Sequence, residues 1–241
     1  MEKAGLKPEY IPHAVRRDVF YPRSEIALPY TNGEFVVGMV AGNFGTYDRK
    51  AFQQCFEGFA LFKSQHKDAV LYVHTDVAEP NSVDLIALAK ACGIAISCPL
   101  PWMILSGISQ DAMAKMYSGM DVLLATSRGE GFGVPIIEAQ SCGTPAIVTY
   151  ATSMAELRGP GWIVWPMHKV WTTNNSWQFI PDPSGIASAL EAAYGLKRDY
   201  PKVWQATKEI SHAFAGVYDL GKVVSDYLIP VLRRAAEAKL E

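Results

Sequence analysis

The chain has 241 residues, a formal net charge of −2 and 19% charged residues. This length allows one large domain with a substantial core, and the near-neutral charge without a basic run excludes a nucleic-acid or anionic-membrane binder as the simplest reading. No apolar stretch is long enough to span a membrane, and the N-terminus lacks the apolar core of a signal peptide, so we expect a soluble, cytoplasmic protein without a transmembrane segment.

Residues 1–33 form the first unit of the predicted organisation. Prolines recur in this stretch, at Pro8, Pro12, Pro22 and Pro29. Because proline lacks a backbone donor and fixes its own φ angle, this spacing favours an extended lead-in or interdomain linker over a domain. We therefore expect the folded domain to span residues 34–241.

Strand-like runs recur through this domain and are mostly separated by helical patterns. The runs are Phe35–Ala41, Val70–His74, Ile94–Ser97, Val122–Thr126, Ala146–Thr149 and Ile163–Trp165. Such alternation predicts an α/β fold, a doubly wound, mostly parallel, Rossmann-like sheet of about six strands with helices on both faces. After the first run, apolar residues at helical spacing predict a helix that packs on the sheet; they are Phe52, Cys55, Phe56, Phe59 and Phe62.

A basic pair follows the first predicted strand. Arg49 and Lys50 come after a loop that begins with Gly42 and Asn43, at the carboxyl end of that strand. Open α/β sheets bind ligands at the carboxyl ends of their strands, so we expect this pair to border the ligand crevice and supply positive charge for phosphates. The alternative is a solvated surface pair.

A glycine-rich loop follows the Val122–Thr126 run and leads into a helix. Gly129, Gly131 and Gly133 let the backbone turn tightly and approach a ligand closely, and a proline suits the first helical turn. The helix N-terminus then makes an anion site that suits a diphosphate. Two carboxylates, Glu130 and Glu138, flank this site, an arrangement suited to a sugar nucleotide.

This segment resembles a known family signature. Glu130-Gly131-Phe132-Gly133-Val134-Pro135, ending in Glu138-Ala139, is similar to the E-x7-E motif of retaining glycosyltransferases with the GT-B fold, most closely glycosyltransferase family 4. Further similar segments, in the same order and rough spacing, extend the resemblance over roughly Tyr10 to Tyr194. They are Gly38-Met39-Val40-Ala41, Tyr117-Ser118-Gly119-Met120-Asp121-Val122, Cys142-Gly143-Thr144-Pro145 and Ala155-Glu156-Leu157.

The resemblance implies roles for individual residues. Glu138 would hold the ribose hydroxyls, Glu130 would lie beside the donor sugar, and Lys50 would hold the diphosphate. The family usually has an arginine a few residues before that lysine, where this chain has Asn43, so both Arg49 and Lys50 are candidates for the phosphate contact. Further candidate substrate-binding residues are Gly42, Asn43, Gly131, Phe132, Gly133, Val134 and Trp102, the last as a stacking partner for the nucleobase.

The implied function is that of a donor-binding domain in a retaining, hexosyltransferase-like enzyme. Its donor would be a nucleoside-diphosphate sugar, with no other cofactor. No D-x-D, H-x-x-H or H-E-x-x-H motif is present in the sequence, so we predict no metal site. Residues 1–33 leave no room for an acceptor domain, so we expect the partner to be an amino-terminal acceptor domain or subunit. Three alternatives stay open: this half has been removed from the chain, is supplied by a separate chain, or is absent in nature.

Two other functions remain as alternatives. The first is a non-catalytic nucleotide-sugar-binding module or partner subunit that needs a separate acceptor domain. The second is a dinucleotide-dependent oxidoreductase, which is disfavoured because Gly42-Asn43-Phe44-Gly45 is not a G-x-G-x-x-G motif and Asp76 lies too far beyond it.

Tryptophans are concentrated near the end of the predicted sheet. Trp171 and Trp177 bracket a polar stretch, and Trp162 and Trp165 precede them. The pattern suits sugar stacking, but aromatic side chains are heavily used in protein cores. We therefore expect these tryptophans to close the sheet edge against the last helices.

Overall fold

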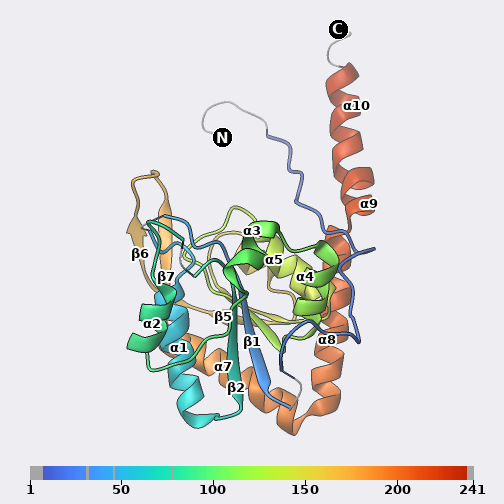
Figure 1. The fold of residues 1–241 in the computed structure, drawn as a ribbon. Helices are drawn as coiled ribbons and strands as arrows, with labels where there is room; N and C mark the ends of the chain where they lie inside the picture. The colour runs from blue at the N-terminus through green and yellow to red at the C-terminus, as the bar shows by residue number, and fades with distance from the viewer. Residues whose placement is uncertain (1–7, 31–32, 46, 78, 238–241) are drawn as a thin grey trace.

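The protein has a doubly wound α/β fold around a parallel five-stranded sheet in the order β2-β1-β3-β4-β5 (Figure 1). The computed structural model describes residues 8–30, 33–45, 47–77 and 79–237. The strands of the sheet are β1 (Phe35–Val40), β2 (Ala69–His74), β3 (Val122–Ala125), β4 (Ala146–Thr149) and β5 (Trp162–Val164). The predicted fold class is confirmed.

The strand order places a topological switch point between β1 and β3. From β1 the chain crosses to β2 on one side, and it then returns across β1 to form β3 on the other. Val37 pairs with Val122, and Gly38 pairs with Leu123, in parallel register. The carboxyl ends of two neighbouring parallel strands therefore open into loops that diverge, which creates the crevice where such sheets bind ligands.

One face of the sheet is covered by three helices that share a hydrophobic core. They are α1 (Phe52–Gln65), α2 (Leu85–Ala91) and α7 (Pro183–Asp199). The predicted apolar stripe of α1 is buried in this core, since Phe52, Cys55 and Phe56 are at most 1% exposed. Burial of these side chains is the main reason that this segment is helical and fixed on the sheet.

The other face is covered by helices and by the lead-in. The helices are α4 (Gln110–Ser118), α5 (Val134–Ser141) and α6 (Met154–Leu157). Val15, Phe20 and Leu28 of the lead-in are buried in the same core. The short helix α3 (Pro101–Ser106) has no buried residue and lies at the end of the sheet where the strands finish (Figure 1).

The run Ile94–Ser97 does not form a sheet strand. It makes a single parallel bridge, between Ser97 and Tyr72 of β2. Ser97 donates its N–H to Leu71 and accepts the N–H of Val73, at 2.9 and 2.8 Å. Pro99 follows almost at once and cannot donate a ladder hydrogen bond, so the pairing ends there and the sheet has five strands.

An antiparallel hairpin follows β5, where the sequence predicted tryptophans packed between the sheet edge and the last helices. Its strands are β6 (Pro166–Trp171) and β7 (Trp177–Pro181), which form a separate two-stranded sheet. Trp171 and Trp177 are 56% and 46% exposed, so the expectation that they pack against the last helices is wrong. In this region Trp162 does pack on a helix, stacking on Trp204 at 6.4 Å between ring centroids.

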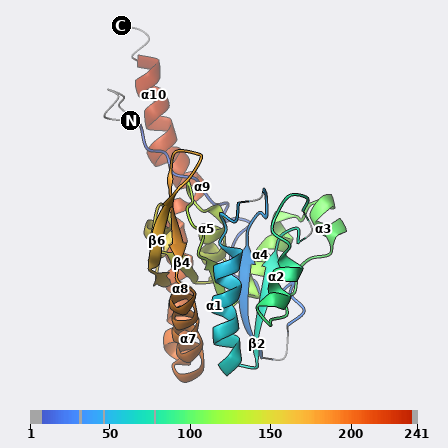
Figure 2. The ribbon, with the colours of Figure 1, turned by 90° about the vertical axis from the view of Figure 1, so that its left-hand side faces the viewer.

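The last helices cross the back of the domain and leave it. Helix α8 (Pro201–Ala215) packs against α5 and α7. A 3-10 turn (Gly216–Tyr218), α9 (Leu220–Val223), a π-helical turn (Val224–Leu228) and α10 (Ile229–Glu237) follow, and α10 projects from the body beside the lead-in (Figures 1 and 2). Among the described residues, no helix is long and apolar enough to cross a membrane.

A substitution at Gly161 tests the tight contact between β4 and β5. A Cβ at this position would lie 1.9 Å from the carbonyl oxygen of Ala146, a backbone atom that cannot move without disturbing the sheet. We expect Gly161→Ala to lower the free energy of unfolding by about 1–3 kcal/mol, measured by urea denaturation. Gly195→Ala in α7, where a Cβ meets no atom within 4 Å, should instead stabilise by about 0.5–1 kcal/mol. Equal effects of the two changes would contradict this packing.

Candidate active site

Two loops meet at the switch point and are joined by ion pairs. Lys50, at the end of the loop after β1, places its Nζ 2.5 Å from Oε1 of Glu130, in the loop after β3. Arg49 places Nη1 2.9 Å from the other carboxylate oxygen of Glu130 and donates to the Gly129 carbonyl at 2.8 Å. The structure therefore brings together the three charged residues that the sequence placed at one crevice.

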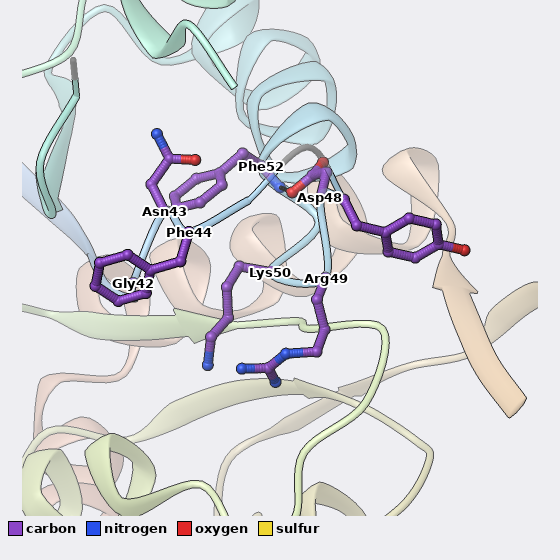
Figure 3. Close-up of a pocket in the computed structure, with 8 residues that line it drawn as sticks. Gly42, Asn43, Phe44, Asp48, Arg49, Lys50 and Phe52 are labelled. Atoms are coloured by element: carbon purple, nitrogen blue, oxygen red, sulfur yellow. Dashed lines mark hydrogen bonds between the residues drawn. The ribbon is translucent and has the colours of Figure 1, made fainter. Parts of the chain in front are cut away.

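The basic pair is positioned by the start of α1. Asp48, three residues before the N-cap Ala51, accepts the N–H groups of Phe52 and Gln53 at 2.9 and 3.1 Å, and these hydrogen bonds fix the turn that carries Arg49 and Lys50. Their side chains extend to the same side of the loop, away from Asn43 (Figure 3). Asp48 was not among the predicted site residues, although an aspartate shortly before a helical pattern is a signal for the start of a helix.

The glycine loop is held from its other side by residues after β4. Thr152 accepts the Glu130 N–H at 3.2 Å, and Ser153 donates to the carbonyl of Phe132 at 2.7 Å. Gly133 begins α5 with a φ of 104°, in the left-handed region that favours glycine. The two hydroxyl residues were also missed, and no motif marks them because their role depends on loops that are distant in sequence.

Glu130 is ionised at neutral pH. Burial raises the pKa of its carboxyl, but the charge of Lys50, the hydrogen bonds from Lys50 and Ser127, and the charge of Arg49 together lower it below its ordinary value. The Glu130 side chain is 13% exposed, compared with 46% for Arg49. The site thus holds one partly buried carboxylate against two cations, one of which reaches solvent.

The second glutamate lies on α5 and has a different environment. Tyr117 of α4 donates its hydroxyl to Oε2 of Glu138 at 2.8 Å. Burial raises the pKa of Glu138, and this hydrogen bond opposes only part of the rise. Tyr117 is fully buried, so it fixes the direction of the carboxylate. Tyr117 belongs to one of the segments similar to the family, but no role was predicted for it from the sequence.

A hollow of about 350 Å³ opens beside Lys50. It lies between the ends of β1 and β2, the loop after β1, α3 and the first turn of α5. Its lining includes Gly42, Asn43, Lys50, His74, Thr75, Ile104 and Pro135. The hydroxyl of Thr75 is buried and has no hydrogen-bond partner among the described residues, and burial lowers the pKa of His74. The hollow therefore places an unsatisfied hydroxyl and a histidine next to a cation, and the acidic residues Asp76 and Glu79 also line it.

The amide of Asn43 faces away from the ion pairs. Its nitrogen donates to the Val83 carbonyl at 2.8 Å and to the Ser82 hydroxyl at 3.0 Å, which ties the loop after β1 to the segment before α2. Gly42 lies beside it, where a Cβ would come 2.4 Å from the ring of Phe44. In this structure Asn43 shapes the wall of the hollow.

The remaining candidates are spread around the start of α5. Gly131 is open, with no atom within 4 Å of a Cβ placed there, and Val134 forms the first helical turn. The Phe132 ring turns inward and contacts Tyr218, at 5.6 Å between centroids, which leaves only its backbone beside the loop. Trp102 is 63% exposed on α3 and is not among the residues that line the hollow beside Lys50.

The fold and site together define a doubly wound α/β domain with a charged crevice at its switch point. Residues 35–194 match the family model of the glycosyl transferases group 1. The chain therefore belongs to the glycosyl transferases group 1 family. This confirms the resemblance seen in the glycine loop and its flanking segments.

Several known proteins are similar to this chain in sequence or in fold. A curated relative, the O-antigen chain mannosyltransferase B of Escherichia coli, is 27% identical over 96 residues, which cover 36% of this chain and 25% of that protein. Sucrose-phosphate synthase of Thermosynechococcus elongatus has the same fold, with a TM-score of 0.73, 18% identity, and coverage of 95% of this chain and 52% of that one. Anabaena Alr3699/HepE, solved in complex with UDP-glucose, gives a TM-score of 0.62 and 16% identity, with coverage of 83% and 49%. The chain thus spans about half the length of these structures.

The contact between Tyr117 and Glu138 generates a prediction. Tyr117→Phe removes the hydroxyl that stabilises the partly buried carboxylate of Glu138, and it should lower the free energy of unfolding at neutral pH by about 1–3 kcal/mol. The pKa of Glu138 should rise further. When folding raises the pKa of an acid, the protein loses stability as the pH rises from the pKa of the unfolded state to that of the folded state. In the variant, where the folded-state pKa is higher still, this loss extends to higher pH. The measurements are urea denaturation against pH and a carboxyl ¹³C NMR titration.

Tyr72→Phe is the matched control. Tyr72 is also buried and also loses a hydroxyl contact, to His74 and Met116, but it does not touch Glu138. A Glu138 titration that is unchanged in Tyr117→Phe, or changed equally in both variants, would show that the Tyr117 hydroxyl does not set the state of this carboxylate.

Proposed function

We propose that this chain is the donor-binding domain of a retaining, metal-independent glycosyltransferase, which moves a sugar from a nucleoside-diphosphate sugar to an acceptor hydroxyl. The observation that carries the proposal is the convergence of Lys50 and Arg49 with Glu130 beside the first turn of α5. Membership of the glycosyl transferases group 1 family supports it. The UDP-glucose held by a structure of the same fold supports the choice of donor class.

The diphosphate is assigned to the cations of the loop after β1. A diphosphate carries more negative charge than one carboxylate and presents several oxygens, so it competes with Glu130 for Lys50 and Arg49. The N-terminus of α5 adds the positive end of a helix dipole at the same place. Glu130 then moves aside and is free to contact the hydroxyls of the donor sugar.

The nucleoside is assigned to the hollow beside Lys50. Its volume of about 350 Å³ lies within the range of small-molecule sites. The partnerless hydroxyl of Thr75 offers a hydrogen bond to a base or ribose. Glu138 does not itself line the hollow, but it lies one helical turn after Pro135, which does. It is assigned to the ribose hydroxyls, with its carboxylate held by Tyr117.

The chemistry assigned to this domain is support for the leaving group. As the bond from the anomeric carbon to the diphosphate breaks, negative charge grows on the phosphate oxygens, and fixed cations with a helix dipole stabilise it. These groups supply the charge without a divalent cation, and among the described residues no three His, Cys, Asp or Glu side chains gather to hold a metal ion. The acceptor wall of the cleft is assigned to an amino-terminal domain or subunit.

A comparison of nucleoside diphosphates with nucleosides tests the assignment. UDP, GDP and ADP and their nucleosides are titrated by calorimetry into the chain. For the diphosphate that binds best, Lys50→Ala should weaken binding about 10-fold to 100-fold, because one charge-assisted contact is lost, and should leave the nucleoside unchanged. Glu138→Ala should weaken both ligands alike. Excess chelator should not alter the affinity.

Lys90→Ala is the matched control, because Lys90 lies exposed on α2. Arg49→Ala measures the share of the second cation. The assignment fails if Lys50→Ala lowers diphosphate and nucleoside affinity equally. A strict requirement for Mg²⁺ or Mn²⁺ would remove metal independence.

A further inference from the structure

A second hollow, of about 410 Å³, lies between the β6–β7 hairpin and the glycine loop. Its lining residues are Arg49, Gly129, Glu130, Gly131, Thr152, Asn174, Ser176, Trp177 and Gln178. The hairpin is tied to the loop because Phe179 donates its N–H to the carbonyl of Arg128 at 2.7 Å. The hollow therefore has two walls that are joined by a backbone hydrogen bond.

This hollow shares the ion pairs with the hollow beside Lys50. Lys50 lines the first hollow, Arg49 lines the second, and Glu130 bridges the two cations. A group bound between the hairpin and the glycine loop thus lies next to the place assigned to the diphosphate and donor sugar. The nucleotide has its own place on the Lys50 side.

Gln178 provides a buried polar group that lacks a partner. It is 7% exposed, and its side-chain carbonyl oxygen has no hydrogen-bond partner among the described residues. A buried acceptor without a partner is costly in a folded protein, and such groups call for an explanation. Because Gln178 lines the hollow, rotation of its amide would bring this oxygen to a hydroxyl donor bound there.

Trp177 provides an aromatic surface at the same place. Its ring is 46% exposed and is held by Trp171, at 5.1 Å between centroids, and by the ammonium of Lys169, 4.3 Å from the ring centroid. Backbone hydrogen bonds also hold the hairpin tip: Thr172 donates its N–H to the carbonyl of Ser176, and its own carbonyl accepts the N–H of Asn175, each at 3.0 Å. The indole and the polar tip are therefore positioned before any ligand arrives.

The combination of these groups favours a carbohydrate. A sugar ring has an apolar C–H face, which packs on an indole, and a rim of hydroxyls, which pair with amides, hydroxyls and charged groups. Ser176 and Gln178 share one face of the hairpin and line the hollow with Asn174, while the indole of Trp177 lies on the other face with Trp171 and Lys169 and meets the hollow at the edge of the strand. Glu130 and Arg49 lie at the inner end of the hollow. A neutral polyol fits a place where the one carboxylate is already balanced by cations.

We propose that the hollow between the hairpin and the glycine loop binds a sugar ring of a saccharide acceptor. This inference rests on the proposed function, since it names the acceptor class for the same site. It gives the β6–β7 hairpin the task of holding a sugar beside the donor, so that an acceptor hydroxyl faces Glu130. The donor-binding domain would thus contribute directly to acceptor recognition.

Fluorine NMR of 5-fluorotryptophan-labelled protein tests the proposal. The Trp177 resonance is assigned by its loss in Trp177→Phe. The probes are methyl α-D-mannopyranoside, methyl β-D-glucopyranoside, methyl β-D-galactopyranoside and maltotriose at millimolar concentration. At least one should shift the Trp177 resonance, and Trp177→Ala and Gln178→Leu should each weaken its binding at least about fivefold, with affinity in the variants read from the probe's own NMR signals.

The controls separate binding from folding. Trp165→Ala removes another exposed tryptophan, one that does not line the hollow, and should leave saccharide binding unchanged. Gln178→Leu should not lower the melting temperature, because the oxygen that it removes has no partner. The proposal is overturned if no probe binds, if binding survives both substitutions in the hollow, or if only a nucleoside-diphosphate sugar shifts Trp177, since the hollow would then hold the donor.

A nucleotide titration of the same samples distinguishes the two proposals. If UDP, GDP or ADP binds and depends on Lys50 while every saccharide fails, the acceptor assignment alone is wrong. If a saccharide binds through Trp177 while no nucleotide binds, the hollow takes carbohydrate but the donor-binding function fails.

Discussion

One partly buried carboxylate, Glu130, holds the two halves of the site together by pairing with Lys50 and Arg49. These residues are far apart in the sequence and meet because β1 and β3 are neighbours in the parallel sheet, with their carboxyl ends at the same edge. The ion pairs therefore depend on the topology, and the geometry of the site depends on the ion pairs. Without Glu130, the two neighbouring cations of the loop after β1 would lie side by side without this carboxylate to balance them.

The same contact separates two hollows of different chemistry. The one beside Lys50 has a partnerless hydroxyl and a histidine whose pKa is lowered by burial, whereas the one beside Arg49 has an indole and a partnerless amide oxygen. In our proposal a nucleotide enters the first hollow, a saccharide enters the second, and the diphosphate takes the place of Glu130 between them. The carboxylate released from the cations then lies between donor and acceptor, where sugar hydroxyls gather.

The sequence predicted those parts of the molecule that local patterns encode. The strand and helix alternation indicated the fold class, and the glycine loop with its flanking charges indicated the crevice of Glu130, Lys50 and Arg49. Features set by tertiary contacts were not accessible: the Tyr117 contact to Glu138 joins two helices, and the amide of Asn43 is used by a distant loop. The hairpin was missed because the sequence does not show whether a tryptophan is exposed or lies in the core. The predicted strand Ile94–Ser97 makes only one bridge because a proline follows it.

Replacing Glu130 by glutamine tests the central claim most directly. If Glu130 occupies the cations that a diphosphate needs, Glu130→Gln should bind inorganic pyrophosphate about threefold to tenfold more tightly than the unaltered chain at low ionic strength, measured by calorimetry. Glu209→Gln on α8, an exposed glutamate away from the site, is the control and should leave pyrophosphate affinity unchanged. Equal or weaker binding by a folded Glu130→Gln variant would contradict the exchange of carboxylate for phosphate on which this account depends.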